Sequence, residues 1–173
     1  MTTDCQIDTE SLCSNLLESI GEEDCLYAFT KIIAEHFHAD AVSILEYKEP
    51  KLHPVAIFGI SKETFGRRFE VADNPRLALI VNSDSPTIFA DNIGLPDPFD
   101  GLINNKEEHL EVHSCSGIPI KAKGKLRGVI TLDSLNLGVF KQFPADNFNS
   151  AAFIVAKIVL QALENHNLRE HIS

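Results

Sequence analysis

The first third of the chain shows a helical and then an extended hydrophobic pattern. Apolar residues between positions 11 and 38 recur at the three- and four-residue spacing of amphipathic helices, and Gly21 divides this stretch into two helices. Ala41–Tyr47 and Leu52–Phe58 are rich in β-branched and aromatic side chains and flank a proline turn, which predicts a hairpin. Because Pro54 lacks an amide donor, we expect its strand to lie near an edge or to carry a bulge.

Short elements follow in the middle of the chain. Ser61 can cap a short helix over Lys62–Arg68, and Asn74 can cap a second helix that begins with Pro75. A short strand is predicted over Pro86–Ala90. Residues 91–111 show no strong period and contain two prolines, two glycines and three asparagines. A stretch this long and irregular in a small domain is usually functional or mobile.

The last third predicts a hairpin followed by a long helix. Cys115–Ala122 and Leu126–Leu132 are extended apolar runs that meet across a Lys-Gly turn. Asp146 can cap a helix whose apolar positions continue to Leu168. This order of elements predicts an α+β domain with a mostly antiparallel central sheet. We expect the terminal helices on one face, and the short helices and irregular loop over a ligand pocket on the other.

The polar ends of the chain suggest its boundaries. We expect residues 1–10 to form a flexible tail, residues 11–168 a single domain, and residues 169–173 the start of a linker. The last helix still has a helical pattern near Ser173 and becomes polar there, so we expect a longer protein with this chain as its first domain. The helix is also a candidate homodimer element, although packing on the sheet explains its apolar face equally well.

Composition narrows the class of protein. A length of 173 residues suits one domain with its own core, and the formal net charge of -10 argues against a nucleic-acid surface. No apolar run approaches the ~20 residues of a membrane span, and the amino terminus is polar and acidic rather than signal-like. No pair among the four cysteines has Cys-x-x-Cys spacing. We therefore expect a cytoplasmic domain with reduced thiols.

Five side chains of metal-binding types lie in the central third of the chain. They are Asp97, Asp100, His113, Cys115 and Asp133. His113 and Cys115 are two residues apart in a predicted strand, so they share a face with Cα atoms about 6.6 Å apart. Asp133 ends the strand that should pair with them. Carboxylate, imidazole and thiolate groups bind transition metals, so a metal site is one interpretation of this cluster.

Each of these residues also has an ordinary structural interpretation. Cys115 can be a small buried hydrophobe, and His113 a hydrogen-bonded surface or core histidine. Asp97 and Asp100 adjoin proline and glycine and can simply form turns, and Asp133 can cap the loop after its strand. No tight metal signature such as His-Glu-x-x-His is present. Residue spacing alone therefore leaves both interpretations open.

Segments around the cluster resemble a known sensor family. Together with the rest of residues 11–168, they are similar to the GAF sensor domain of the anaerobic nitric oxide reductase transcription regulator. The segments that carry the resemblance are Gly66-Arg-Arg-Phe69, Asn74-Pro-Arg-Leu77, Leu95-Pro-Asp-Pro-Phe-Asp-Gly-Leu-Ile103, Val112-His-Ser-Cys-Ser-Gly-Ile-Pro119 and Gly128-Val-Ile-Thr-Leu-Asp133.

The resemblance implies a regulatory domain with one non-haem ferrous iron. In that family, nitric oxide binds the iron and relieves repression of a neighbouring AAA+ ATPase, which then activates transcription. Matched segment by segment, the implied ligands are Asp100, His113, Cys115 and Asp133. Arg76 matches an arginine thought to be displaced by the gas, and Asp97 matches a further position of the site. Because guanidinium stays protonated, we expect Arg76 to orient an aspartate instead.

Other interpretations of the cluster remain open. Zinc binds such donors more tightly than ferrous iron, so it is an expected substitute. A metal-free GAF module for small molecules such as cyclic nucleotides is one alternative, although the acidic residues disfavour an anionic ligand. A cysteine-dependent reductase of free methionine sulfoxide is another, but Cys115 has no evident resolving partner near the expected pocket. We therefore expect a regulatory domain rather than an enzyme.

Overall fold

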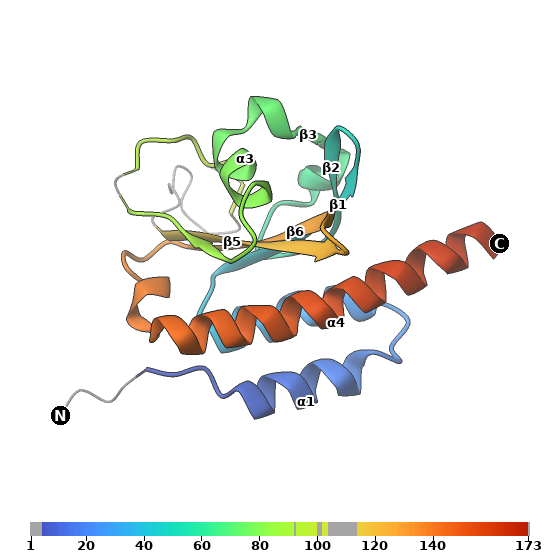
Figure 1. Ribbon diagram of the computed structural model, residues 1–173, viewed down its shortest axis with the longest axis horizontal. Coiled ribbons are helices and arrows are strands. Elements are labelled where there is room, and N and C mark those ends of the chain that lie inside the picture. The colour runs from blue at the N-terminus through green and yellow to red at the C-terminus, as the bar shows by residue number, and fades with distance from the viewer. Residues whose placement is uncertain (1–4, 92, 100–101, 104–113, 173) are drawn as a thin grey trace.

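The computed structural model describes residues 5–91, 93–99, 102–103 and 114–172. Its strands form one antiparallel six-stranded sheet in the order β3-β2-β1-β6-β5-β4 (Figure 1). The two central strands of this sheet, β1 and β6, are far apart in the sequence. The strands are β1 Ala41–Lys48, β2 Lys51–Phe58, β3 Phe69–Glu70, β4 Thr87–Ile88, β5 Ser114–Ala122 and β6 Lys125–Ser134.

Helices cover both faces of this sheet. The long helix α4 and the helices α1 and α2 lie on one face, and α3 lies on the other (Figure 1). None of the described helices is long and apolar enough to cross a membrane. The helices are α1 Thr9–Ser19, α2 Cys25–Phe37, α3 Pro75–Val81 and α4 Ala145–Ile172, with 3₁₀ turns at Lys62–Gly66, Val71–Asp73 and Phe140–Gln142.

The two faces bury separate hydrophobic cores. The first core packs α2 and α4 on the sheet and α1 against these two helices, and it includes an edge-to-face contact of Phe37 with Phe148 at 5.4 Å between ring centroids. The second core lies under α3 and contains Leu77, Phe99 and Cys115. Because both faces are covered, β5 is buried on both sides from Ser114 to Ile120. The predicted α+β arrangement, with terminal helices on one face, is confirmed.

The predicted hairpins and helix break are also present. The first helical region divides around Gly21, because α1 ends at Ser19 and α2 begins at Cys25. A register shift between Ile44 and Leu45 lies opposite Pro54, which matches the predicted bulge. The second hairpin turns at the Lys-Gly step, and both turn residues have positive φ.

Three predicted details of the helices are wrong. Asp146 does not cap α4 but lies in its first turn, because Pro144 precedes the helix and its carbonyl accepts the amide of Phe148 at 2.9 Å. The Lys62 element is a 3₁₀ turn that ends at Gly66, without a side-chain cap from Ser61. Helix α3 does begin at Pro75 with Asn74 at its N-cap position, but Asn74 makes no capping hydrogen bond, and its side-chain amide Nδ2 donates instead to the Glu70 carbonyl at 2.8 Å.

Candidate metal centre

The centre of the second core contains a thiol and a carboxylate on neighbouring strands. Cys115 of β5 and Asp133 of β6 are direct partners in the antiparallel register, so their side chains project from the same face. This face is the one that α3 covers, since Cys115 belongs to the second core. Both residues are deeply buried, with exposed fractions of 5% and 1%. The sheet register therefore holds the two groups side by side.

A third candidate ligand comes from the loop that follows β4. Asp97 is 6% exposed, and its Oδ1 accepts the amide of Phe99 at 2.8 Å. Phe99 is fully buried in the same core, which anchors this turn of the loop beneath α3. One ligand atom from each of Asp97, Cys115 and Asp133 lies within 4.8 Å of the other two. Residues from three separate elements thus converge on one small volume.

Arg76 ties the loop to α3. Its Nη1 donates to Asp97 Oδ2 at 3.2 Å, and its Nε and Nη2 both donate to the Leu95 carbonyl at 3.0 and 2.8 Å. The guanidinium also lies over the ring of Phe89, 5.4 Å from its centroid. Arg76 therefore contacts a candidate ligand through one edge and the loop backbone through the other.

The electrostatics of the cluster favour protons or a cation. Within the described residues, neither carboxylate oxygen of Asp133 has a hydrogen-bond partner. Burial, and then the nearby charge of Asp97, raise the pKa of Asp133 well above its ordinary value. Burial, followed by the charges of Asp133 and Asp97, likewise raises the pKa of the Cys115 thiol, and the positive charge of Arg76 offsets only part of this. A metal ion could replace these protons.

The donor set fits a transition metal. Thiolate and carboxylate together suit ions such as zinc or ferrous iron better than magnesium or calcium, which prefer oxygen ligands alone. Two of the predicted ligands, Asp100 and His113, lie outside the described residues, so the four-residue ligand set stays a prediction. The cluster instead includes Asp97, which the resemblance placed among the further positions of the site. Asp97 lies between two prolines in an irregular segment, so no periodic pattern in the sequence predicts which way its side chain points.

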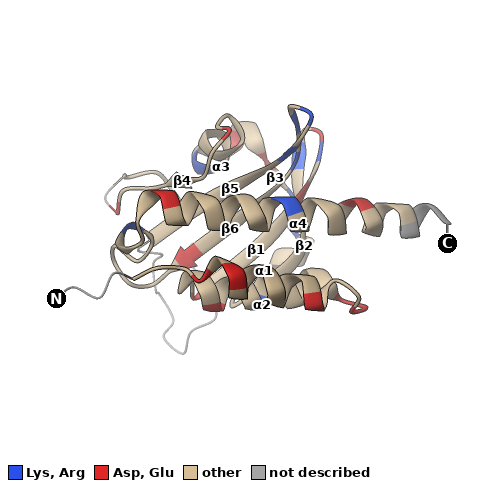
Figure 2. Ribbon diagram, turned by 60° about the horizontal axis from the view of Figure 1, so that its bottom comes forward, with Lys and Arg blue, Asp and Glu red and all other residues tan. Residues whose placement is uncertain are grey.

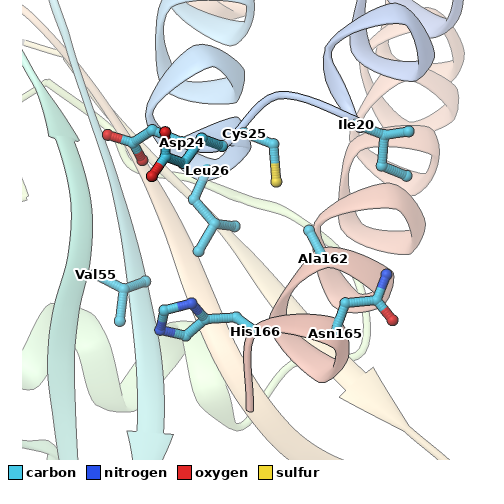
Figure 3. A pocket seen from close by; sticks show the side chains of 9 residues that line it. Ile20, Asp24, Cys25, Leu26, Val55, Ala162, Asn165 and His166 are labelled. Atoms are coloured by element: carbon cyan, nitrogen blue, oxygen red, sulfur yellow. The ribbon is translucent and has the colours of Figure 1, made fainter. Parts of the chain in front are cut away.

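A separate cavity lies on the opposite side of the sheet. It has a volume of about 120 Å³ and is bounded by the start of α2, by β2 and by the last turns of α4 (Figure 3). Asp24, Cys25 and His166 are among its lining residues. Across the described part of the chain, however, three metal-binding side chains come within coordinating reach of one another only at Asp97, Cys115 and Asp133.

The sequence is similar to bacterial transcription regulators. It is 44% identical over 130 residues to the nitric oxide reductase transcription regulator NorR1 of Cupriavidus necator, covering 75% of this chain and 25% of that protein. It is 34% identical over 148 residues to the regulatory protein LuxO of Vibrio cholerae, covering 86% and 28%. It is also 31% identical over 163 residues to the anaerobic nitric oxide reductase transcription regulator NorR of Shigella dysenteriae, covering 91% and 32%. The chain thus spans about a quarter to a third of each relative.

Solved structures share the fold at low sequence identity. The GAF domain of a Coxiella burnetii phosphoenolpyruvate-protein phosphotransferase has a TM-score of 0.66 and 17% identity, covering 92% of this chain and 96% of that one. Free methionine-R-sulfoxide reductase of Neisseria meningitidis has a TM-score of 0.64 and 15% identity, covering 91% of each. Residues 21–157 match the GAF domain family itself. The family match and the shared fold together show that this chain belongs to the GAF domain family.

Proposed function

We propose that this chain is the sensor domain of a transcription activator and that it binds nitric oxide at a single non-haem ferrous iron. The names of two of the relatives support the nitric oxide assignment. The observation that carries the proposal is the buried cluster of Asp97, Cys115 and Asp133, in which neither oxygen of Asp133 makes a hydrogen bond of normal geometry to a described residue and its polar neighbours are the other two members of the cluster. Unpaired buried carboxylates are rare in folded proteins unless a cation or a proton compensates them.

Charge balance within the cluster supports a divalent ion. When fully ionised, Asp97, Cys115 and Asp133 are three anions beside the single cation Arg76. Among the described residues two negative charges then remain, and a divalent metal ion would offset them, whereas ionised Asp100 would add one further negative charge to the site. Cys115 and Asp133 would hold the ion from the sheet, and Asp100 and His113, which lie outside the described residues, are proposed to complete the site. When bound, ferrous iron supplies a coordination position that a diatomic gas can occupy.

Arg76 has a positioning role in this proposal. Its three hydrogen bonds to Leu95 and Asp97 keep the loop against α3 and keep one carboxylate directed at the cluster. A guanidinium so fixed neutralises part of the negative charge without occupying a coordination position. Movement of the loop on gas binding would strain or break these hydrogen bonds, which links the site to the surface of the domain.

The burial and the raised pKa of the Cys115 thiol agree better with a regulatory role than with catalysis. The thiolate is the reactive form of cysteine, and burial raises the pKa of this thiol, so the metal-free residue is a weak nucleophile. Cys13 and Cys25 lie on α1 and α2, across the sheet from it. They are badly placed to resolve an oxidised Cys115. We therefore propose that the domain signals by binding a ligand. Its proposed partner is a downstream ATPase domain, as in the family that the sequence resembles.

Anaerobic reconstitution tests the proposal directly. We expect one ferrous iron per chain and, after nitric oxide is added, a half-integer-spin EPR signal. Zinc-loaded protein is the matched control, because it should bind metal and show no such signal. The Cys115→Ser variant should bind iron more weakly. A folded, iron-loaded sample that gives no EPR signal with nitric oxide would refute the sensing function, whereas failure to bind any transition metal would refute the metal site itself.

A further inference from the structure

Helix α4 has an outward face that is separate from the face it packs on the sheet. Val155, Val159 and Ala162 point into the first core and are almost fully buried. Phe153 and Leu168, which share the apolar pattern of the sequence, are instead 63% and 60% exposed. The apolar pattern of α4 is therefore only partly explained by the core. Two large apolar side chains remain in contact with solvent.

These two residues belong to one narrow stripe along α4. Phe153, Lys157, Glu164 and Leu168 fall within a sector of about 60° when successive residues turn by 100°. We call these residues the α4 stripe. From Phe153 to Leu168 the stripe is about 22 Å long, at 1.5 Å per residue.

The α4 stripe is symmetric about a point between Leu160 and Gln161. Phe153 and Leu168 are equidistant from this point in sequence, and so are Lys157 and Glu164. A two-fold axis through this point and perpendicular to the helix would bring each member opposite its counterpart in a second, antiparallel copy. Apolar residues would then meet apolar residues, and the lysine of each copy would meet the glutamate of the other. Such reciprocity is what a two-fold interface requires.

The charges on α4 favour this arrangement. Figure 2 shows a basic segment along α4 with acidic segments on either side of it. The ammonium group of Lys157 lies over the ring of Phe153, 5.3 Å from its centroid. In the described regions, neither Lys157 nor Glu164 has an ion-pair partner. A parallel pairing in register would instead place lysine against lysine and glutamate against glutamate.

A groove next to Phe153 enlarges the apolar surface. It has a volume of about 220 Å³ and lies between α4 and the β4–β5 edge of the sheet. Pro86, Ile118 and Ala156 are among its lining residues, and Phe153 also borders it. In the antiparallel pairing, the partner's Leu168 approaches Phe153 at the border of this groove. The groove therefore provides space for an apolar side chain of the second copy.

We propose that two copies of this chain associate through their α4 stripes in an antiparallel, two-fold symmetric arrangement. Its basis is the symmetric placement of exposed Phe153, Lys157 and Leu168 and of half-buried Glu164 about one point of the helix. The interface does not involve the metal centre, which lies beyond the sheet on its other face. It is small, so the association is weak and depends on protein concentration.

Charge-reversal variants of the metal-free 173-residue chain distinguish this arrangement from other pairings. Sedimentation velocity should show a monomer–dimer equilibrium between about 10 µM and about 1 mM. The single variants Lys157→Glu and Glu164→Lys should each raise the dimer Kd about tenfold or more, because each places like charges together at two symmetry-related positions. The double variant Lys157→Glu/Glu164→Lys should restore the dimer, because the swapped charges pair again. Circular dichroism should confirm that every variant is folded.

Substitution of the apolar residues gives a second, independent test. Phe153→Ser should abolish dimerisation, whereas Leu137→Ser, which changes an equally exposed leucine away from α4, should leave the Kd unchanged. A chain that stays monomeric up to about 1 mM would overturn the proposal. Single reversals that leave the Kd unchanged, or a double variant as weak as the single ones, would overturn the antiparallel arrangement and indicate another pairing.

Discussion

Asp133 combines almost complete burial with two carboxylate oxygens that lack partners among the described residues. A buried charge in this state destabilises the folded protein unless a proton or a cation compensates it. The neighbouring Asp97 and Cys115 add to the cost when they are ionised, since all three groups become negative. Asp133 should therefore destabilise the metal-free protein and stabilise the metal-bound protein.

The Asp133→Asn variant separates these two effects. We expect the free energy of unfolding of the metal-free protein near neutral pH to rise by about 1 kcal/mol, because a buried carboxylate is replaced by a neutral group. We also expect the affinity for zinc to fall by more than about tenfold. Urea unfolding and calorimetric zinc titration measure the two changes. The exposed Asp84→Asn variant is the control and should alter stability by less than about 0.5 kcal/mol. A strongly destabilised metal-free Asp133→Asn would contradict this account.

The pH dependence of stability should differ in sign with and without metal. The pKa of Asp133 is raised in the folded protein, so its contribution to stability is complete below the unfolded pKa of about 4 and is lost as pH rises through the folded pKa. Cys115, whose pKa is also raised, acts in the same direction at higher pH. The metal-free protein should therefore lose stability through this pH range.

Saturating zinc should reverse this trend, because the metal binds deprotonated ligands and its binding releases protons. Thermal unfolding from about pH 5 to about pH 9, with zinc and with a chelator, tests the prediction. The Asp133→Asn variant should show a smaller slope in the chelator series, and Cys115, whose pKa is also raised by burial, should account for part of the remaining slope. Parallel slopes with zinc and with chelator would argue against metal ligation by these groups.

At the scale of elements, the site depends on how the loop after β4 is attached to α3. Arg76 bonds Leu95 and Asp97 and is nearly buried. Helix propensity predicts that Arg76 lies on a helix, but it does not predict that the side chain reaches a residue 21 positions away. Such a contact depends on the packing of two elements, and local sequence preferences do not encode it.

Removal of this guanidinium should loosen the loop. We expect Arg76→Ala to destabilise the protein by about 2–4 kcal/mol, because buried Asp97 loses its cation, and to lower zinc affinity about 10- to 100-fold. Arg76→Lys should recover only part of the lost stability and of the lost zinc affinity, since a lysine cannot contact Leu95 and Asp97 at once as the guanidinium does. Urea unfolding and hydrogen exchange over residues 95–99 measure these effects. The exposed Arg68→Ala variant should change stability by less than about 0.5 kcal/mol, and equal losses in both alanine variants would contradict this role.

The first residues of α1 and α4 show which features of a helix local sequence patterns can predict. Asp8 caps α1 by accepting the amide of Ser11 at 3.0 Å, as aspartate often does. Asp146 has the same local signature, yet the helix begins one residue earlier, after Pro144. A capping residue and a first-turn acid both stabilise a helix start, so sequence alone does not distinguish them. The apolar periods located the helices, and packing decided their end residues.

At the scale of the whole molecule, the candidate site is linked to α4. Ser114 and Ser134 adjoin Cys115 and Asp133, and both hold the loop that leads to this helix. Ser114 Oγ donates to the Asn136 carbonyl at 2.6 Å, and Ser134 Oγ donates to Asp40 at 3.0 Å. A shift of the ends of β5 and β6 on ligand binding would therefore move residues 134–139. We propose α4 as the output of the domain on this basis.

Hydrogen exchange with and without zinc or ferrous iron tests this path. We expect metal binding to slow exchange in residues 134–139 and in the first turns of α4, because fixed strand ends restrain the loop. Nitric oxide added to the iron form should change exchange in the same segments. Asp133→Asn serves as the matched variant and should show neither response. Unchanged exchange in α4 under all these conditions would place the output elsewhere.

The sequence by itself determined the succession of elements, the α+β class and the assignment of the terminal helices to one face. Periodicity and turn residues are local, so they can be read without coordinates. Only the tertiary structure decided that Cys115 and Asp133 face each other, because strand register is set by pairing along two whole strands. It also gave the contact by which Arg76 holds Asp97 in the cluster, and it left Phe153 exposed, because the packing of elements distant in sequence controls both.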